Sequence, residues 1–248
     1  MLKPIWKHII ASVCAVIVVA YMVFGITMSH RTALLPCRQV LICIQDSAER
    51  MYITKAEIMH LLNEKKMSPI GLTIQDFHPQ RIEDAVTAHP MLRTCECYTD
   101  IRGNICLRVT QRIPLVRVVT GADTYFIDTD RKLMPVRASV KTSVLAVTGD
   151  VSRRMAAEQI SDFAEWLQYD EYWKNRIIRI QMDSPQMVRL IQSDGAADIC
   201  LGKWSDYQRK MNKLHRWYVA GQGLNLEQYR SVDVRYDGQV VGVKEVDS

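Results

Sequence analysis

Apolar and polar positions divide the chain into one long apolar run near the N-terminus and a body of short alternating segments. The run covers residues 9–28, which contain no Asp, Glu, Lys or Arg, and half of which are Val, Ile or Phe. A helix rises about 1.5 Å per residue, so a run of this length matches a hydrocarbon core of about 30 Å. We therefore expect a single transmembrane helix that begins at Ile9 and ends at Met28.

The residues on either side of this run predict its orientation. Lys3 and Lys7 precede it in the short segment 1–8, and the positive-inside rule places such a segment in the cytoplasm. A cleaved signal peptide is the alternative, but its apolar region is shorter, and the residues after Met28 do not resemble a cleavage site. We expect a cytoplasmic tail at 1–8, a juxtamembrane linker at 29–38 and an extracytoplasmic body.

The first part of the body predicts the element order strand, helix, helix, strand, strand. Residues 38–45 alternate apolar and other side chains, as a half-buried strand does. Thr54 and Glu57 have the spacing of a helix capping box, and a second amphipathic segment follows that helix. Two alternating segments, 91–99 and 104–111, then predict a hairpin.

The second part of the body predicts a mixed sheet with two helices. Segments with a helical period begin near Met155 and Ser205, and the segments around them alternate in the manner of short strands. The expected fold class is α+β, with two domains behind the transmembrane helix. The first is a β-α-α-β-β domain at 39–112, and the second is a mixed α/β domain with an antiparallel-rich sheet at 113–248.

The end of the chain predicts a hairpin with a tight turn. Segments 231–236 and 239–243 alternate, and Asp237 and Gly238 stand between them. An Asp-Gly pair in this position is typical of a two-residue hairpin turn. Because this hairpin ends the chain, we expect its last strand to lie at a sheet edge. There, unpaired backbone N–H and C=O groups can accept a strand from another protein.

Charge adds little to this interpretation. The formal net charge is +5, and Lys3 and Lys7 contribute two of these charges. The remainder is too small to indicate a nucleic-acid partner. The basic segment 203–216 is interpreted as a solvated helix face, with anionic lipid or an acidic partner as the alternatives.

The chain has seven cysteines, and their spacing leaves two interpretations open. Six of them follow the apolar run, where an oxidising compartment would permit three disulfides, whereas buried free thiols would act as small apolar side chains. A Cys-x-Cys spacing is a weak signal for zinc, so no metal is expected. Cys14 lies in the apolar run, and the other six are Cys37, Cys43, Cys95, Cys97, Cys106 and Cys200.

No enzymatic motif is present in the sequence. There is no phosphate-binding glycine loop, zinc-protease motif or nucleophile turn. Asp123, Asp128 and Asp130 lack the glycine and the terminal glutamate of a calcium loop and are typical of hairpin turns. We expect neither an enzyme nor a cofactor.

The ordered set of these features resembles a known family. A strand-helix-helix-strand-strand unit after a single span is similar to a POTRA domain. The closing sequence Val-Asp-Val-Arg-Tyr-Asp-Gly at 232–238 resembles the β domain of the bacterial cell-division family FtsQ/DivIB, with Val234 where Leu is common. Further matches in place and order are Ile53-Thr54, His89-Pro90, Arg112-Ile113-Pro114 and Tyr125-Phe126-Ile127-Asp128.

This resemblance implies a non-enzymatic, single-pass scaffold of the inner membrane at the division septum. Such a protein binds FtsB and FtsL, contacts other divisome proteins of the FtsK, FtsW and FtsI types, and links early division proteins to septal peptidoglycan synthesis. Some relatives carry an aromatic residue shortly after the hairpin turn, where this chain has Val243. The partner-binding residues implied are Tyr236, Asp237, Gly238, Gln239, Val240, Val241 and Val243.

Two other functions stay open on the sequence alone. A POTRA-containing envelope scaffold or a transport-related chaperone would have the same anchor and first domain. A membrane-tethered sensor of a small ligand would share only the anchor and an extracytoplasmic fold. Both differ from a division protein in localisation, since neither is expected to concentrate at mid-cell.

Overall fold

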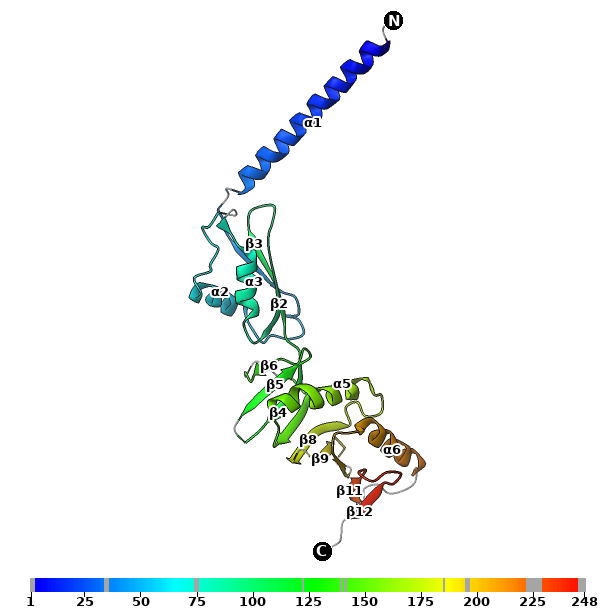
Figure 1. Ribbon diagram of the computed structural model, residues 1–248. Coiled ribbons are helices and arrows are strands. Elements are labelled where there is room, and N and C mark those ends of the chain that lie inside the picture. Colours follow the sequence, from blue (N-terminus) through cyan, green and yellow to red (C-terminus); the bar gives the residue numbers. More distant parts are fainter. Residues whose placement is uncertain are drawn as a thin grey trace. The chain divides into compact units, whose positions relative to one another are not determined.

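The structure is a computed structural model that divides into two compact units, Met1–Gln111 and Arg112–Ser248 (Figure 1). Each unit is described by itself. Residues 1–2 of the expected cytoplasmic tail and 34–35 of the expected linker lie outside the described residues. The structure describes residues 3–33, 36–73, 76–121, 123–138, 140, 142–184, 186–194, 197–221 and 229–244.

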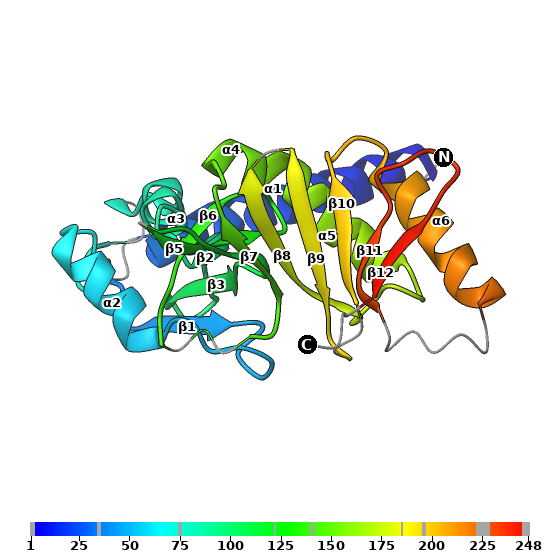
Figure 2. The same ribbon diagram turned by 90° about the horizontal axis from the view of Figure 1, so that it is seen from below.

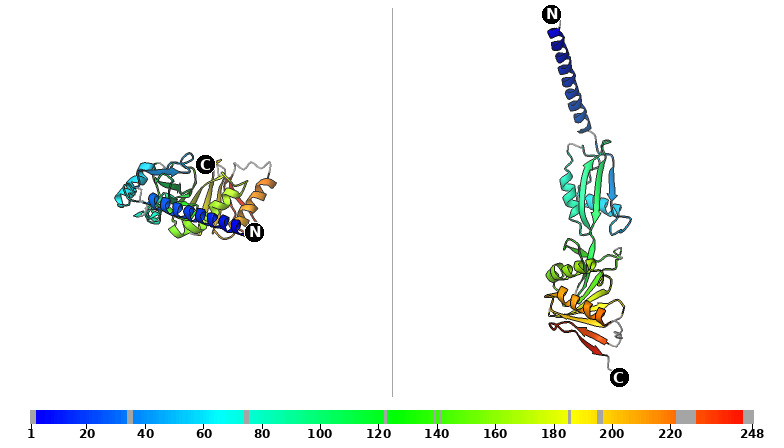
Figure 3. Two further views of the ribbon diagram at one scale, coloured as in Figure 1. Left: turned by 90° about the horizontal axis from the view of Figure 1, so that it is seen from above. Right: turned by 90° about the vertical axis from the view of Figure 1, so that its right-hand side faces the viewer.

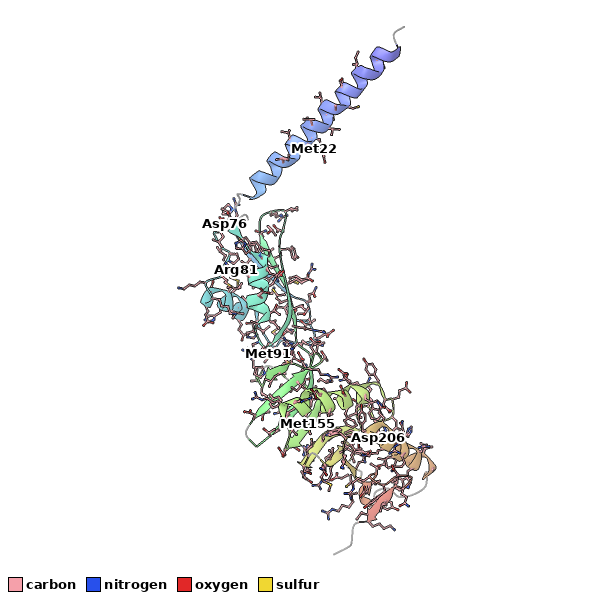
Figure 4. The ribbon with its side chains drawn as sticks, viewed as in Figure 1. Met22, Asp76, Arg81, Met91, Met155 and Asp206 are labelled. Carbon is pink, nitrogen blue, oxygen red and sulfur yellow. The ribbon has the colours of Figure 1, made fainter. Side chains whose placement is uncertain are left out.

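The first element, α1 (Lys3–Ala33), contains the whole apolar run and extends past both of its ends. Residues 29–33 of the expected linker are therefore helical. Met22, labelled in Figure 4, is one of many large apolar side chains of α1 that are more than half exposed. Within the described part of the chain, no helix combines the length and the apolarity that crossing a membrane requires. The structure thus gives the transmembrane helix expected at 9–28 no support.

The rest of the first unit has the predicted order strand, helix, helix, strand, strand. Its strands form a sheet in the order β1-β3-β2, in which β1 is parallel and β2 antiparallel to β3. Both helices can be followed beside this sheet in Figures 1 and 3. The elements are β1 (Val40–Ile44), α2 (Lys55–Glu64), α3 (Pro79–Thr87), β2 (Leu92–Thr99) and β3 (Ile105–Gln111).

Local sequence signals explain most of these boundaries. The Thr54 hydroxyl accepts a hydrogen bond from the Glu57 backbone at 3.2 Å, and the Glu57 carboxylate accepts one from the Thr54 backbone at 2.7 Å. The predicted capping box is therefore confirmed. Asp100 accepts hydrogen bonds from the backbone N–H groups of Arg102 and Asn104, which closes the turn between β2 and β3.

One buried side chain holds the loop before α2. The Gln111 side-chain oxygen accepts hydrogen bonds from the backbone N–H groups of Tyr52 at 2.7 Å and Ile53 at 3.2 Å. Its amide nitrogen donates to the Arg50 carbonyl at 2.8 Å and to Asp46 at 3.2 Å. Gln111 is only 1% exposed, so these bonds lie out of water and fix the loop against the end of β3.

The second unit is one mixed sheet with helical segments against it (Figure 2). The strand order is β12-β11-β10-β9-β8-β7-β4-β5-β6. Neighbours are parallel at β4–β7, β7–β8 and β10–β11 and antiparallel elsewhere, which confirms an antiparallel-rich α+β domain. The strands are β4 (Pro114–Val119), β5 (Thr124–Asp128), β6 (Leu133–Pro135), β7 (Leu145–Gly149), β8 (Ile177–Ser184), β9 (Met187–Gln192), β10 (Asp198–Gly202), β11 (Tyr229–Asp233) and β12 (Val241–Lys244).

Two helical regions supply the second unit's core together with the strands. The first runs through α4 (Arg153–Met155), a π-helical turn (Ala156–Ile160) and α5 (Ser161–Tyr169), and the second is α6 (Tyr207–Ala220). Phe163, on α5, and Met211 and Leu214, on α6, are fully buried in one cluster with residues of the sheet. A row of paired, buried positions crosses the helix-covered face: Val118, Val147, Ile180, Leu190, Ile199 and Val232.

The start of α6 differs from the sequence prediction. The spacing of Ser205 and Gln208 predicts a cap at Ser205, but the capping position is Asp206, labelled in Figure 4, with a φ of 57° and no side-chain capping bond. The positive φ places Asp206 in the left-handed region, which Asp tolerates better than most residues. The helix begins one residue later than a Ser205 cap would allow, because the chain must first turn out of β10.

All seven cysteines are free thiols in the structure. Cys37 and Cys97 are buried in the core of the first unit, as the free-thiol interpretation expects. Burial, with smaller effects from neighbouring acidic groups and thiols, raises the pKa of Cys97 to about 12. Such a thiol stays protonated at neutral pH and acts as a small apolar side chain.

Candidate partner-binding edge

The last strand lies at the end of the nine-stranded sheet, as the sequence predicts. β12 pairs antiparallel with β11, with Asp233 opposite Val241, Val232 opposite Gly242 and Ser231 opposite Val243. In the described residues, no strand pairs with the other side of β12. With respect to the described strands, the backbone N–H and C=O groups on that side can therefore bond to a further strand.

The two faces of β12 differ in chemistry. Val241 and Val243 point away from the helix-covered face and are 42% and 50% exposed. Gly242 points to the covered face, where a Cβ would lie 2.5 Å from ring atoms of Tyr229. The Tyr229 ring in turn meets Trp217 of α6 edge-on, with ring centroids 5.9 Å apart. Glycine at position 242 therefore lets the strand lie flat on an aromatic pair.

The connection between β11 and β12, residues 234–240, is longer than predicted. The sequence predicts strands that reach 236 and resume at 239, and that prediction is wrong because β11 ends at Asp233 and β12 starts at Val241. The Val234 N–H donates to the Cys200 carbonyl of β10 at 3.1 Å, and its side chain is fully buried. The chain thus stays with β10 for one more residue before it turns. Gly238 has a φ of +72°, a conformation that glycine adopts without strain.

A buried carboxylate organises the first residues of this connection. Asp233 accepts hydrogen bonds from the Arg235 backbone at 3.0 Å and from the Arg235 guanidinium at 2.5–3.0 Å. Burial disfavours the charged form of Asp233, but the hydrogen bonds from Arg235 outweigh it and hold the pKa of the carboxyl below its ordinary value. The pair therefore stays ionised at neutral pH and fixes the Arg235 side chain.

Gly202 makes the room that Arg235 needs. A Cβ at Gly202 would lie 2.7 Å from Cγ and 2.8 Å from Cδ of Arg235, and the φ of Gly202 is +72°. The β9–β10 register shifts between Cys200 and Gly202, so the strand is irregular at this point. A side chain at position 202 would displace Arg235 from its place beside Asp233.

Helix α6 holds the same connection from the other side. The Lys213 ammonium donates to the backbone carbonyls of Val234, at 3.0 Å, and of Tyr236. Arg209 forms an ion pair with Asp237 at 2.9 Å. Burial lowers the pKa of Lys213, which is consistent with an ammonium partly removed from water. Arg209 is 63% exposed, which is consistent with the interpretation of 203–216 as a solvated helix face, whereas Lys213 is partly buried against the connection.

The structure brings the predicted site residues together along one edge. Tyr236, 53% exposed, lies with its ring 5.8 Å from the Arg235 guanidinium carbon. Asp237, Gly238 and Gln239 are exposed in the connection. Gln239 therefore lies outside β12, although the sequence predicts that the strand begins there. Of the three predicted valines, Val241 and Val243 lie in β12, and Val240 is half-buried against the core.

The sequence did not reveal the residues that support this edge. The sequence pattern predicts that Lys213 and Arg209 are ordinary cations of a helix face, and nothing in their spacing distinguishes them from their neighbours. Gly202 and Tyr229 lie outside any recognised motif, and each acts on a residue that is distant along the chain. Only Asp233 and Arg235 have a spacing that indicates their contact, because an Asp side chain can accept a hydrogen bond from the backbone N–H two residues further along the chain.

Two family models match the chain. The model described as FtsQ/DivIB, C-terminal related, matches residues 113–243, which is more than half of the chain and covers the whole second unit up to β12. The model described as POTRA-like domain matches residues 35–110, the unit that contains β1 to β3. None of the curated proteins matches the chain.

These matches agree in order and extent with the two units and with the edge described above. Within the first unit, residues 35–110 are thus a POTRA-like domain. In the second unit, the matched region contains the Asp233–Arg235 pair and β12 up to Val243. The chain belongs to the FtsQ/DivIB, C-terminal related family, a family of cell-division scaffold proteins.

Proposed function

We propose that this protein is a scaffold of the bacterial divisome that binds a small division protein of the FtsB type by strand addition to β12. The observation that carries the proposal is the free side of β12 at the end of the sheet. In this role the protein would bind FtsB-like and FtsL-like partners and connect early division proteins with septal peptidoglycan synthesis. No catalytic step is needed.

The chemistry of the edge fits an extended partner. Backbone groups on the free side of β12 would supply hydrogen bonds whatever the partner's sequence, so they contribute affinity but little choice. Val241 and Val243 offer exposed apolar contacts on one face, and Tyr236 in the preceding connection offers an exposed aromatic ring with a polar tip. An added strand with apolar residues at alternate positions would cover these side chains.

Membrane attachment is the second part of the proposal. It rests on the uncharged residues 9–28 and on the exposed apolar side chains of α1. We infer a single pass through the inner membrane, with the N-terminus in the cytoplasm and the two domains at 39–112 and 113–248 outside. The test is membrane fractionation with alkaline extraction, together with fusions at Ser248 of reporters that are active on one side only. A protein released by alkali, or a reporter active only in the cytoplasm, would contradict this part.

The binding test uses two sheet edges of the same domain. The double variant Val241→Glu/Val243→Glu places charges on the exposed face of β12, and we expect it to lose co-purification with the FtsB-like protein of the same bacterium. Leu133→Glu on β6 is the matched control. It lies at the opposite end of the sheet and is about as exposed as Val241, at 41% against 42%. Equal binding by the β12 variant and the wild type would rule out this edge.

Localisation separates division from the competing function. A fluorescent fusion should form a band at mid-cell, and depletion should produce filaments. The POTRA-like domain is also compatible with an envelope scaffold or a transport-related chaperone that is not dedicated to division. Uniform fluorescence at the cell rim and normal division after depletion would favour that alternative.

A further inference from the structure

Two lysines one turn apart on α6 make the same kind of contact with different loops. Lys210 donates to the backbone carbonyls of Leu201, at 3.2 Å, and Lys203, at 2.7 Å. Lys213 donates to the backbone carbonyls of Val234 and Tyr236. Lys210 therefore holds the segment between β10 and α6, whereas Lys213 holds the connection that leads into β12.

The carbonyls held by Lys213 flank Arg235, the residue that Asp233 holds from the sheet side. The start of the connection is thus fixed from two directions, by a carboxylate of β11 and by an ammonium of α6. Both carbonyls are backbone groups, so the contact sets the path of the chain and not merely the position of a side chain. The second carbonyl belongs to Tyr236. The connection continues to position 240, and β12 begins at Val241.

β12 depends on this path more than an inner strand would. It has four residues and pairs with a single neighbour in the described residues. A short edge strand has few bonds of its own and opens more easily than strands in the sheet interior. Whatever fixes its entry point therefore has a large share in keeping it in register.

We propose that Lys213 is a positioning residue of the partner-binding edge, holding residues 234–240 so that β12 is presented in register to an incoming strand. The inference rests on the proposed function, because it concerns the same edge. Lys213 does not need to touch the partner. It acts by raising the fraction of molecules in which the edge is already formed.

The expected size of the effect follows from that fraction. When only part of the population can bind, the apparent dissociation constant rises by the inverse of the competent fraction. If loss of the ammonium lowers the competent fraction to about one tenth, binding weakens about tenfold. The amides of β12 should also exchange with solvent faster in the absence of any partner, because exchange reports local opening.

The experiment compares three full-length variants in detergent: Lys213→Met, Lys213→Arg and Lys210→Met. Methionine keeps the length and the apolar stem of lysine but cannot donate a hydrogen bond, whereas arginine keeps a donor. Lys210→Met loses two equivalent bonds from the same helix and is the matched control. Hydrogen exchange of peptides covering 241–244 is measured without partner. Affinity is measured with the extracytoplasmic segment of the FtsB-like protein, and thermal unfolding shows whether the variants are equally folded.

We expect Lys213→Met to speed exchange at β12 and to weaken binding about tenfold, with recovery in Lys213→Arg and changes within about twofold for Lys210→Met. Equal exchange and equal affinity in Lys213→Met and the wild type would overturn the inference alone. Equal losses in Lys213→Met and Lys210→Met would also overturn it, because the effect would then be general destabilisation. A wild-type protein that does not bind the segment overturns the proposed function, and with it the inference.

Discussion

The two units each use one polar side chain to hold a loop by its backbone, but they place that side chain differently. In the POTRA-like unit, the neutral amide of Gln111 is almost completely buried and bonds the loop before α2. In the second unit, the charged ammonium of Lys213 is only half-buried and bonds the connection before β12. The same task is thus performed once inside the core and once at the surface.

The difference teaches where the cost of losing each contact falls. A buried backbone N–H without an acceptor cannot turn to water, so removal of Gln111 should be felt by the whole unit. The carbonyl of Tyr236, an exposed residue, can bond to water when Lys213 is absent, so the effect should remain more local than the loss of Gln111. The first loop belongs to the buried part of its unit, and the second leads into the edge strand β12.

The largest effect is expected for Gln111→Leu. Leucine fills similar space but leaves the Tyr52 and Ile53 N–H groups without the oxygen that now accepts from them. The free energy of unfolding of the first unit should fall by about 2–6 kcal/mol, at about 1–3 kcal/mol for each of the two N–H groups that lose their partner. Denaturant-dependent hydrogen exchange of β3 peptides measures the loss. Unchanged exchange would contradict the expectation that losing the buried Gln111 contact costs more than losing the contact made by Lys213.

Gly242→Val should come next and should affect the other unit. The new side chain would meet the Tyr229 ring at 2.5 Å, so the ring or the strand must move. Overpacking of this kind costs about 1–3 kcal/mol, and we expect the loss at β12 and not in the inner strands. Peptides from β8 and β9 serve as the internal control in the same exchange experiment. Equal loss in those strands would show that the edge is not a separate cooperative element.

Low pH should weaken the contact between Asp233 and Arg235 but not the hydrogen bonds of the uncharged Gln111 amide. The pKa of Asp233 is lower in the folded protein than its ordinary value of 3.8. The charged form therefore contributes stability above that value, and the contribution is lost as pH falls through the lower, folded-state pKa. In Arg235→Gln, the pKa of Asp233 should be higher than in the wild type, so the stability that the carboxylate contributes is lost at a higher pH. The free energy of unfolding at neutral pH should fall by about 1 kcal/mol. The carboxyl carbon shift of Asp233 in a pH titration checks both points, and a pKa at or above 3.8 in the wild type would contradict them.

The smallest effect is expected for Arg209→Gln. Both partners of the Arg209–Asp237 ion pair are largely exposed, at 63% and 82%. Such pairs contribute about 0–1 kcal/mol and are screened by salt. Thermal unfolding should change little, and the difference from wild type should vanish at high ionic strength. A large, salt-independent loss would show that Arg209 acts like Lys213.

Sequence reasoning succeeded where a structure is determined by neighbours along the chain. The Thr54–Glu57 capping box and the Asp100 turn are contacts within four residues, and both were predictable from spacing alone. The periodicity likewise predicted the order of helices and strands along the POTRA-like part of the chain. These features belong to local geometry, which the sequence pattern expresses directly.

The connection 234–240 was mispredicted because distant residues decide it. An Asp-Gly pair favours a two-residue turn, but Val234 bonds to β10 and Lys213 bonds to the carbonyls on both sides of Arg235. Lys213 lies 21 residues before the carbonyl of Val234. Tertiary contacts of this kind override a local turn preference, and no periodicity reports them.

The contact made by Lys213 has an evolutionary consequence. It is addressed to main-chain oxygens, which every amino acid provides, and not to the side chains at 234 and 236. Substitutions of the exposed side chain at position 236 can therefore change the surface of this edge while the hydrogen bonds from Lys213 remain. The exposed surface can thus vary between related sequences while the contact made by Lys213 is retained.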